Sequence, residues 1–169
     1  MKLFLVVFIF VYLTTARAVE HRHEEAHVHG AGKISIAFDG LNGRIEFEAA
    51  AESILGFEYR AKSARDKAIL TNALSSFKKD FNSMVQFDQN RGCVISADQV
   101  DQSFENKKST HSNFKATYNV ICKSLLADST IRFDFSAFEH LNDIDVNIVV
   151  DELQKNIEIS DKKSSVQLK

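Results

Sequence analysis

Alternation of apolar and polar residues is the clearest pattern in the first part of the chain. It runs through residues 33–38 and again through residues 44–49, with an apolar side chain at every second position. Residues 39–43 separate the two runs and contain two glycines in a turn-forming sequence. Because a β-strand points successive side chains to opposite faces, this pattern predicts an antiparallel hairpin with one buried face.

Further alternating runs predict additional strands. A third strand is expected over residues 92–102, and a polar loop then leads to a long fourth strand over residues 111–122. The inward face of the fourth strand carries an apolar row that ends in Cys122, and His111 faces away from that row. The remaining segments give weaker predictions: a strand at 145–150, shorter strands at 157–159 and 166–168, a short helix or bent strand around Phe133, Phe135 and Phe138, and a polar turn at 161–165.

A single segment has helical periodicity. Ser63 is a favourable N-cap, and Asp66 follows three residues later, where a carboxylate stabilises a helix start. Apolar residues then recur at spacings of three and four, which predicts a helix from about Ala64 to Lys79. Fourteen phenylalanines with no tryptophan and no proline predict a core built from phenylalanine. The fold class expected is α+β, a mainly antiparallel sheet with one principal helix, in a single domain over residues 33–169.

Residues 1–18 have the organisation of a secretory signal peptide. Lys2 precedes an apolar run from Leu3 to Leu13, and Ala16-Arg17-Ala18 fits the small-x-small cleavage pattern. The run is short for a membrane span, which needs roughly 20 residues. An uncleaved anchor is the alternative interpretation. Cleavage would export the protein from the cytoplasm, with no membrane segment in the mature chain.

Removal of the signal changes the charge. Lys2 and Arg17 leave with it, so 19 basic residues face 23 acidic ones and the net charge moves from −2 to −4. The mature chain has no basic stripe, which argues against nucleic acid as a partner. The same acidity argues against binding to an anionic membrane surface.

Four of the six histidines fall in the short stretch between the predicted cleavage site and the first strand. We define residues 19–32 as the N-terminal arm and expect it to be flexible. His27 and His29 are two apart, as are His21 and His23, so each pair shares a face if the arm is extended. Neutral imidazole is the commonest metal ligand, and carboxylates such as Glu25 are a usual second choice. The pattern indicates either a metal-capturing arm or a solvated lead-in without fixed geometry.

Cleavage after Ala18 creates a second metal-binding possibility. The mature chain would begin Val19-Glu20-His21, with histidine in third position. The terminal amine, two backbone amides and that imidazole can make a square-planar site of four nitrogens, which suits copper or nickel rather than zinc.

Cys93 and Cys122 are the only cysteines. An exported protein lies in an oxidising compartment, where pairing is the default. Both residues occupy inward positions of predicted strands, so a disulfide between them is favoured. Two buried thiols or two thiolate metal ligands are the alternatives.

Several short motifs, taken in order, resemble the ZrgA-like family of periplasmic zinc-binding proteins. The motifs are Glu25-Ala26-His27-Val28-His29-Gly30, Gly56-Phe57-Glu58, Gly92-Cys93, His111-x-x-Phe114-x-x-x-Tyr118-x-x-x-Cys122 and Phe135-x-x-Phe138. The resemblance covers nearly all of the mature chain. It implies a secreted Gram-negative protein, made when zinc is scarce, that helps to supply zinc to an import system.

The resemblance also implies particular ligands. His27 and His29 match the most specific motif, and His111 matches a weaker one. Glu58 matches the family's Gly-Phe-Glu, but Tyr59 stands where a histidine often follows. The loop at 103–110 contains no histidine, although many members carry a long histidine-rich loop there. This departure argues for one compact site together with the arm.

Zinc binding for zinc acquisition is therefore the first functional hypothesis. Tetrahedral zinc needs one or two ligands beyond His27 and His29, and His111, His23, Glu25 and Glu58 are the candidates. An arm that reaches a neighbouring chain would make the site part of a homodimer. The alternatives are a copper- or nickel-binding exported protein and an exported structural domain with incidental histidines. No sequence motif of a zinc hydrolase or a serine hydrolase is present, so an enzyme is not expected.

Overall fold

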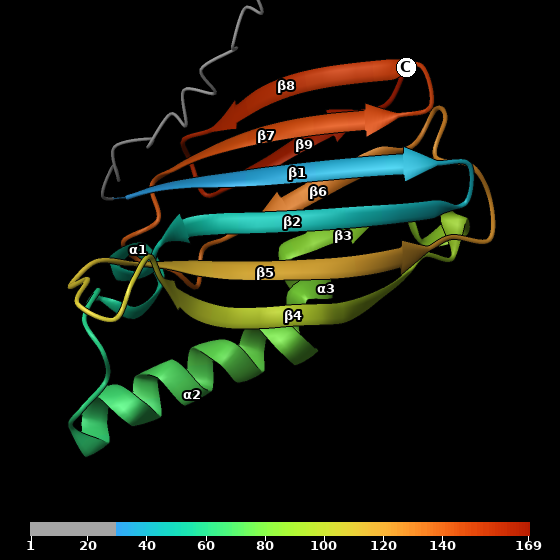
Figure 1. Ribbon diagram of the computed structural model, residues 1–169. Coiled ribbons are helices and arrows are strands. Elements are labelled where there is room, and N and C mark those ends of the chain that lie inside the picture. Colours follow the sequence, from blue (N-terminus) through green and yellow to red (C-terminus); the bar gives the residue numbers. More distant parts are fainter. Residues whose placement is uncertain (1–29) are drawn as a thin grey trace, which may run out of the picture.

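Two β-sheets and one long helix make up the part of the chain that the structure describes, residues 30–169 of a computed structural model (Figure 1). The larger sheet contains β1 (Ala31–Asp39), β2 (Asn42–Ala50), β4 (Val94–Phe104), β5 (Ser112–Ile121), β7 (Asp143–Val150) and β8 (Leu153–Ile159). The smaller sheet contains β3 (Val85–Phe87), β6 (Thr130–Asp134) and β9 (Lys163–Gln167). The helices are α1 (Ala51–Leu55), α2 (Ala64–Lys79), α3 (Phe81–Met84) and the 3₁₀ turn η1 (Gln89–Arg91). The predicted signal peptide and most of the N-terminal arm lie outside the described residues.

The principal helix α2 has the bounds that the sequence predicts. The Ser63 hydroxyl accepts a hydrogen bond from the Asp66 backbone N–H at 3.0 Å, and the Asp66 carboxylate accepts one from the Ser63 N–H at 3.4 Å. This reciprocal capping box satisfies two N–H groups that a helix start otherwise leaves without partners. The helix therefore begins where its capping residue, rather than its apolar face, places it.

The larger sheet has the order β4-β5-β2-β1-β7-β8. The predicted β1–β2 hairpin is confirmed, with Asp39 opposite Asn42 next to the turn. All pairings in both sheets are antiparallel except one, because β1 pairs in parallel with β7 from Ala31 opposite Asp143 to Phe38 opposite Val150. The expectation of a mainly antiparallel α+β fold is confirmed, and the smaller sheet and the parallel pair add to it.

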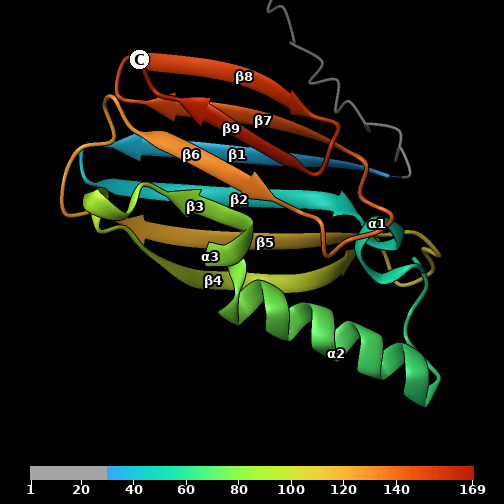
Figure 2. The same cartoon turned by 180° about the vertical axis from the view of Figure 1, so that it is seen from behind.

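One face of the larger sheet is buried and the other is open. In Figure 2, α3 and the smaller sheet lie across one face, while α2 runs along the β4 side. Within residues 30–169 no helix or strand covers the opposite face, which we call the open face (Figure 1). One cross-strand row on the open face consists of six charged residues whose signs alternate except at the first pair, which is two acids: Glu158, Asp145, Lys33, Glu48, Lys115 and Asp101. Such polar residues explain how this face remains in water.

The buried face is built from aromatic rings, as the composition predicts. Phe77 of α2 is fully buried, and its ring lies 4.6 Å from the Phe114 ring of β5. The Tyr118 ring is stacked on Phe81 at 3.8 Å, and the Tyr118 hydroxyl donates a hydrogen bond to the Phe77 carbonyl at 2.9 Å. That bond satisfies a carbonyl in the last turn of α2, where no helical N–H is available. Burial raises the pKa of Tyr118, so its hydroxyl remains protonated and able to donate.

Several predicted element bounds are wrong. The segment after β2 contains the short helix α1, for which no helix was predicted, and β9 begins at Lys163, inside the predicted polar turn. The predicted third strand starts at Val94 and reaches Phe104, and its register shifts between Ala97 and Gln99. Such a bulge moves one residue out of the alternation, which is why the apolar pattern fades there.

The disulfide between Cys93 and Cys122 is confirmed, with an S–S distance of 2.06 Å. Cys93 directly precedes β4 and Cys122 directly follows β5. The bond therefore joins the start of β4 to the end of β5, at one edge of the sheet. The alternatives of free thiols and thiolate ligands are thereby excluded for these residues.

The smaller sheet contains an acidic side chain whose ionisation should affect stability. Hydrogen bonds from the Ser136 hydroxyl, the Lys163 ammonium and the Ser136 backbone N–H lower the pKa of Asp134 from 3.8 to about 2. Because the pKa is lower in the folded state, the stabilisation is present above pH 4 and is lost as the pH falls through about 2. The Asp134→Asn variant should therefore be less stable than the wild type near pH 6, by less than about 1 kcal/mol since the pair is exposed.

Urea denaturation at a series of pH values measures this difference. The gap between the two proteins should close between pH 4 and pH 2. Asp161→Asn, at an exposed position in the β8–β9 turn, is the charge-matched control and should show no such gap. A gap that stays constant over this pH range would contradict the role assigned to Asp134.

Candidate metal-binding site

Glu58 and His111, which are far apart in sequence, meet at one end of the larger sheet. The Glu58 Oε2 atom contacts the His111 Nδ1 atom. The Glu58 side chain is only 12% exposed, whereas the His111 side chain is 63% exposed. The pair therefore has a protected carboxylate behind an imidazole that faces solvent.

Local backbone geometry places Glu58. Helix α1 is capped at its C-terminal end by Gly56, whose φ of +75° is a left-handed conformation that favours glycine, and the Gly56 N–H donates to the Glu52 carbonyl at 2.8 Å. The chain therefore turns sharply after α1, and Glu58 follows two residues later. In the Gly-Phe-Glu motif, the glycine allows the left-handed turn and the glutamate supplies the carboxylate that contacts His111.

Polar contacts to neighbouring segments hold Glu58 and His111 in place. The Ser112 hydroxyl, which is buried, donates to the Glu58 carbonyl. The Gln102 amide of β4 donates to the same carbonyl at 3.3 Å and to the Ser112 hydroxyl at 2.8 Å. On the other side, the Ser109 hydroxyl donates to the His111 carbonyl at 2.8 Å. These bonds connect three segments, so the pair is positioned before any ligand arrives.

The root of the N-terminal arm is attached at the same end of the sheet (Figure 1). Gly30, which follows His29 directly, donates its N–H to the buried Ser53 hydroxyl of α1 at 3.0 Å. The Gly30 carbonyl accepts from the Asn142 N–H at 2.8 Å. Gly30 has a φ of +85°, so the extended conformation of β1 does not continue through this residue. The predicted ligands His23, Glu25, His27 and His29 lie outside the described residues, as do Val19, Glu20 and His21.

His140 lies at this end too, although it belongs to none of the sequence motifs. A Cβ atom placed on Gly56 would lie 4.0 Å from the His140 Nε2 atom, and one on Gly30 would lie 3.4 Å from the His140 carbonyl oxygen. The parallel β1–β7 pair explains this position. Parallel strands start at the same end of a sheet, so the residues before β7 lie beside the residues before β1. A prediction of the parallel β1–β7 pair would have been needed to place His140 at this end of the sheet.

The donor set within residues 30–169 is incomplete for zinc. No group of three or more His, Cys, Asp and Glu side chains is arranged there to hold a metal ion. Structural zinc sites use four protein ligands, and open sites use three. Glu58 and His111 alone do not make such a site, so a zinc site that included them would need further donors.

Comparison with known proteins gives a family. The model of the ZrgA family of zinc uptake proteins matches residues 26–168, which is most of the chain. No curated protein matches the chain. None of the helices in the described part of the chain is long and apolar enough to cross a membrane.

Proposed function

Because the chain belongs to the ZrgA family of zinc uptake proteins, we propose that it binds zinc in the periplasm and supplies it to an import system. The proposed site is the end of the larger sheet where Glu58, His111 and the arm root lie. The Glu58–His111 contact is the observation that carries the proposal. An uptake protein must bind and release its ion, and this role requires no catalytic step.

The contact suggests different roles for the two side chains. The Glu58 carboxylate faces the Nδ1 atom of His111, which leaves the Nε2 atom to bind zinc. A carboxylate behind a ligating histidine fixes the tautomer and the ring orientation, and it makes the imidazole a stronger donor. We therefore assign His111 as a ligand and Glu58 as the group that orients it. Direct coordination by Glu58 is the alternative.

The remaining ligands are proposed to come from the arm. Gly30 is fixed by Ser53 and Asn142, so the residues directly before it start from this end of the sheet. His27 and His29 are the first choice, and His23 and Glu25 are further candidates. One imidazole from the folded domain with two from the arm would give a three-ligand zinc site with an open position. Such a site allows the ion to be passed on.

Replacement of both His27 and His29 by alanine should weaken zinc binding at least about tenfold. Glu58→Gln should weaken it about tenfold, the scale of the loss of an orienting carboxylate. Titration calorimetry with zinc on the mature, tag-free protein measures both.

The affinity for zinc should also fall below a pH of about 6.5, since imidazole must be neutral to bind.

Glu46→Gln is the matched control for Glu58→Gln. Glu46 pairs with Arg44 on the open face, away from the proposed site, so its replacement should leave zinc affinity unchanged. If the His27/His29 double variant binds zinc as the wild type does, the proposed site is wrong. An exported structural domain with incidental histidines would then be the better interpretation.

A further inference from the structure

Strand β8 forms one outer edge of the larger sheet, at the top of Figures 1 and 2. It pairs with β7 on one side only, and no other strand of residues 30–169 pairs with its outer side. An outer edge presents backbone N–H and C=O groups that can pair with another strand.

The two long edges of this sheet differ in how they are protected. On the opposite edge, β4 has a bulge between Ala97 and Gln99 and packs beside α2, both of which hinder edge pairing. Strand β8 pairs with β7 in continuous register over all seven of its residues. The outer strands of the smaller sheet, β3 and β9, have only three and five residues. Thus β8 is the long, regular edge of the described structure.

The β7–β8 turn determines which backbone groups point outward. Val150 lies opposite Leu153, so the turn contains two residues, Asp151 and Glu152, and Asp151 has the positive φ of a tight hairpin. The residues that flank such a turn exchange both backbone hydrogen bonds, and the pattern then alternates along the strands. Gln154, Asn156 and Glu158 therefore direct their N–H and C=O groups away from β7.

We propose that β8 pairs with β8 of a second copy of this chain, antiparallel, about a two-fold axis at Asn156. In this register Asn156 faces itself and Gln154 faces Glu158, so all the outward backbone groups find partners. Leu153 faces Ile159, and Lys155 faces Ile157. No two like charges stand opposite each other, which is the self-complementarity that a two-fold interface requires.

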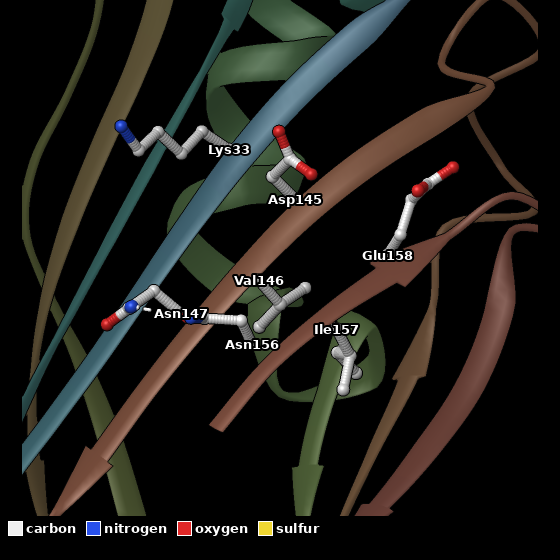
Figure 3. Close-up of a pocket in the computed structure, with 7 residues that line it drawn as sticks. All are labelled: Lys33, Asp145, Val146, Asn147, Asn156, Ile157 and Glu158. Carbon is white, nitrogen blue, oxygen red and sulfur yellow. Dashed lines mark hydrogen bonds between the residues drawn. The ribbon is translucent and has the colours of Figure 1, made fainter. Parts of the chain in front are cut away.

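Side chains on the open face favour the same register. The Asn147 amide donates to the Asn156 Oδ1 atom at 2.6 Å, across β7 and β8 (Figure 3). These two side chains border an open hollow of about 410 Å³, which Lys33, Asp145 and Glu158 also line. Two facing Asn156 residues would continue the amide row into the second copy. Gln154 of that copy would lie beside Glu158 at the rim of the hollow.

Lys155 is the side chain of β8 that would hinder pairing if it pointed across the edge. It projects from the other face of the strand, and its Nζ donates to the Gln167 carbonyl of β9 at 2.6 Å. The ammonium is thereby held within its own chain. The half-buried Leu153 and Ile157 on the same face would gain cover from the second copy.

This inference goes beyond the proposed function and does not depend on it. A two-fold axis at Asn156 reverses the strand direction in the second copy, so the two Glu58–His111 sites would lie at opposite ends of the joined sheet. Each chain would keep its own zinc site. Zinc stoichiometry per chain should consequently be the same in monomer and dimer.

Cross-linking of cysteine variants of the mature full-length protein tests the register. Asn156→Cys places two thiols on the axis, where Cα atoms of a hydrogen-bonded pair are about 5.5 Å apart. A short bis-maleimide should link most of this protein into dimers. Gln154→Cys is the matched control, because its two copies would lie about 13 Å apart along the strands and should remain unlinked. Linkage of Gln154→Cys but not of Asn156→Cys would overturn the register.

Sedimentation velocity of unlinked protein tests the dimer itself. The wild type should sediment as a dimer at high concentration and dissociate on dilution. Asn156→Pro removes an outward N–H and the Asn147–Asn156 side-chain bond but leaves the backbone bonds between β7 and β8 in place, so it should weaken association about tenfold or more with an unchanged circular dichroism spectrum. Asn156→Lys, which sets two like charges on the axis, gives a second variant if the proline disturbs the strand, and Asn147→Lys is its control. A wild-type protein that is monomeric over about a hundredfold range of concentration would overturn the proposal.

Discussion

Phe77→Ala should lower the free energy of unfolding by about 3–5 kcal/mol, the usual cost of emptying a fully buried aromatic position. Phe77 is 0% exposed, and its ring lies 5.0 Å from Phe47, 4.6 Å from Phe114 and 5.2 Å from Phe138. These partners come from β2, β5 and the segment before β7. A cavity here would therefore loosen α2 and both sides of the core together.

Urea denaturation followed by circular dichroism measures the loss. Phe87→Ala is the matched control: the same change is made at a half-buried ring, which contacts Phe38 at 5.5 Å. The control should cost clearly less, because less apolar area is removed from the core. An equal loss in the two variants would mean that the core is not centred on Phe77. Since domains are stable by only about 5–15 kcal/mol, the Phe77 variant should be marginal at 37 °C.

Removal of the disulfide has the second large effect. The Cys93→Ser/Cys122→Ser double variant should lose about 3.5 kcal/mol, as the chain-entropy model gives for a bond that joins residues 29 apart. The bond restricts the unfolded chain, so the folded structure should change little. Zinc affinity should be retained at low temperature, because the disulfide and the Glu58–His111 pair lie at opposite ends of β4 and β5.

Denaturation with and without a reducing agent tests this effect. The wild type should lose about the same stability on reduction as the double variant has lost already, and the double variant should not respond to the reductant. Serine is used because free thiols would themselves bind zinc. A wild type as stable when reduced as when oxidised would contradict the prediction.

Local patterns in the sequence predict the local structure well. The bounds of α2 were predicted because Ser63 and Asp66 form a capping box, whose signal depends on four consecutive residues. The β1–β2 hairpin was predicted from alternation and a glycine turn, and the disulfide from two inward positions in a chain predicted to be exported. In each case the interaction involves neighbouring residues or a strong chemical preference.

Long-range pairing was not predictable in the same way. Strands β1 and β7 both alternate, but alternation does not tell which strands are neighbours or whether they run parallel. The position of His140 beside Gly56 depends on that pairing and was missed with it. Only the motif resemblance pointed to both Glu58 and His111. No spacing rule connects two residues that lie before and after α2 in the sequence. The arm ligands remain predictions.

The central position of β1 has a consequence for how the protein folds. Its neighbours in the sheet are β2, which follows at once, and β7, whose first paired residue, Asp143, is more than one hundred positions from Ala31. The middle of the sheet can close only when nearly the entire polypeptide is present, and such distant pairing slows folding. A chain that emerges gradually, N-terminus first, would have one side of β1 unpaired for most of its emergence. Until β7 pairs with it, the unpaired side of β1 is the side most open to pairing with a non-native strand.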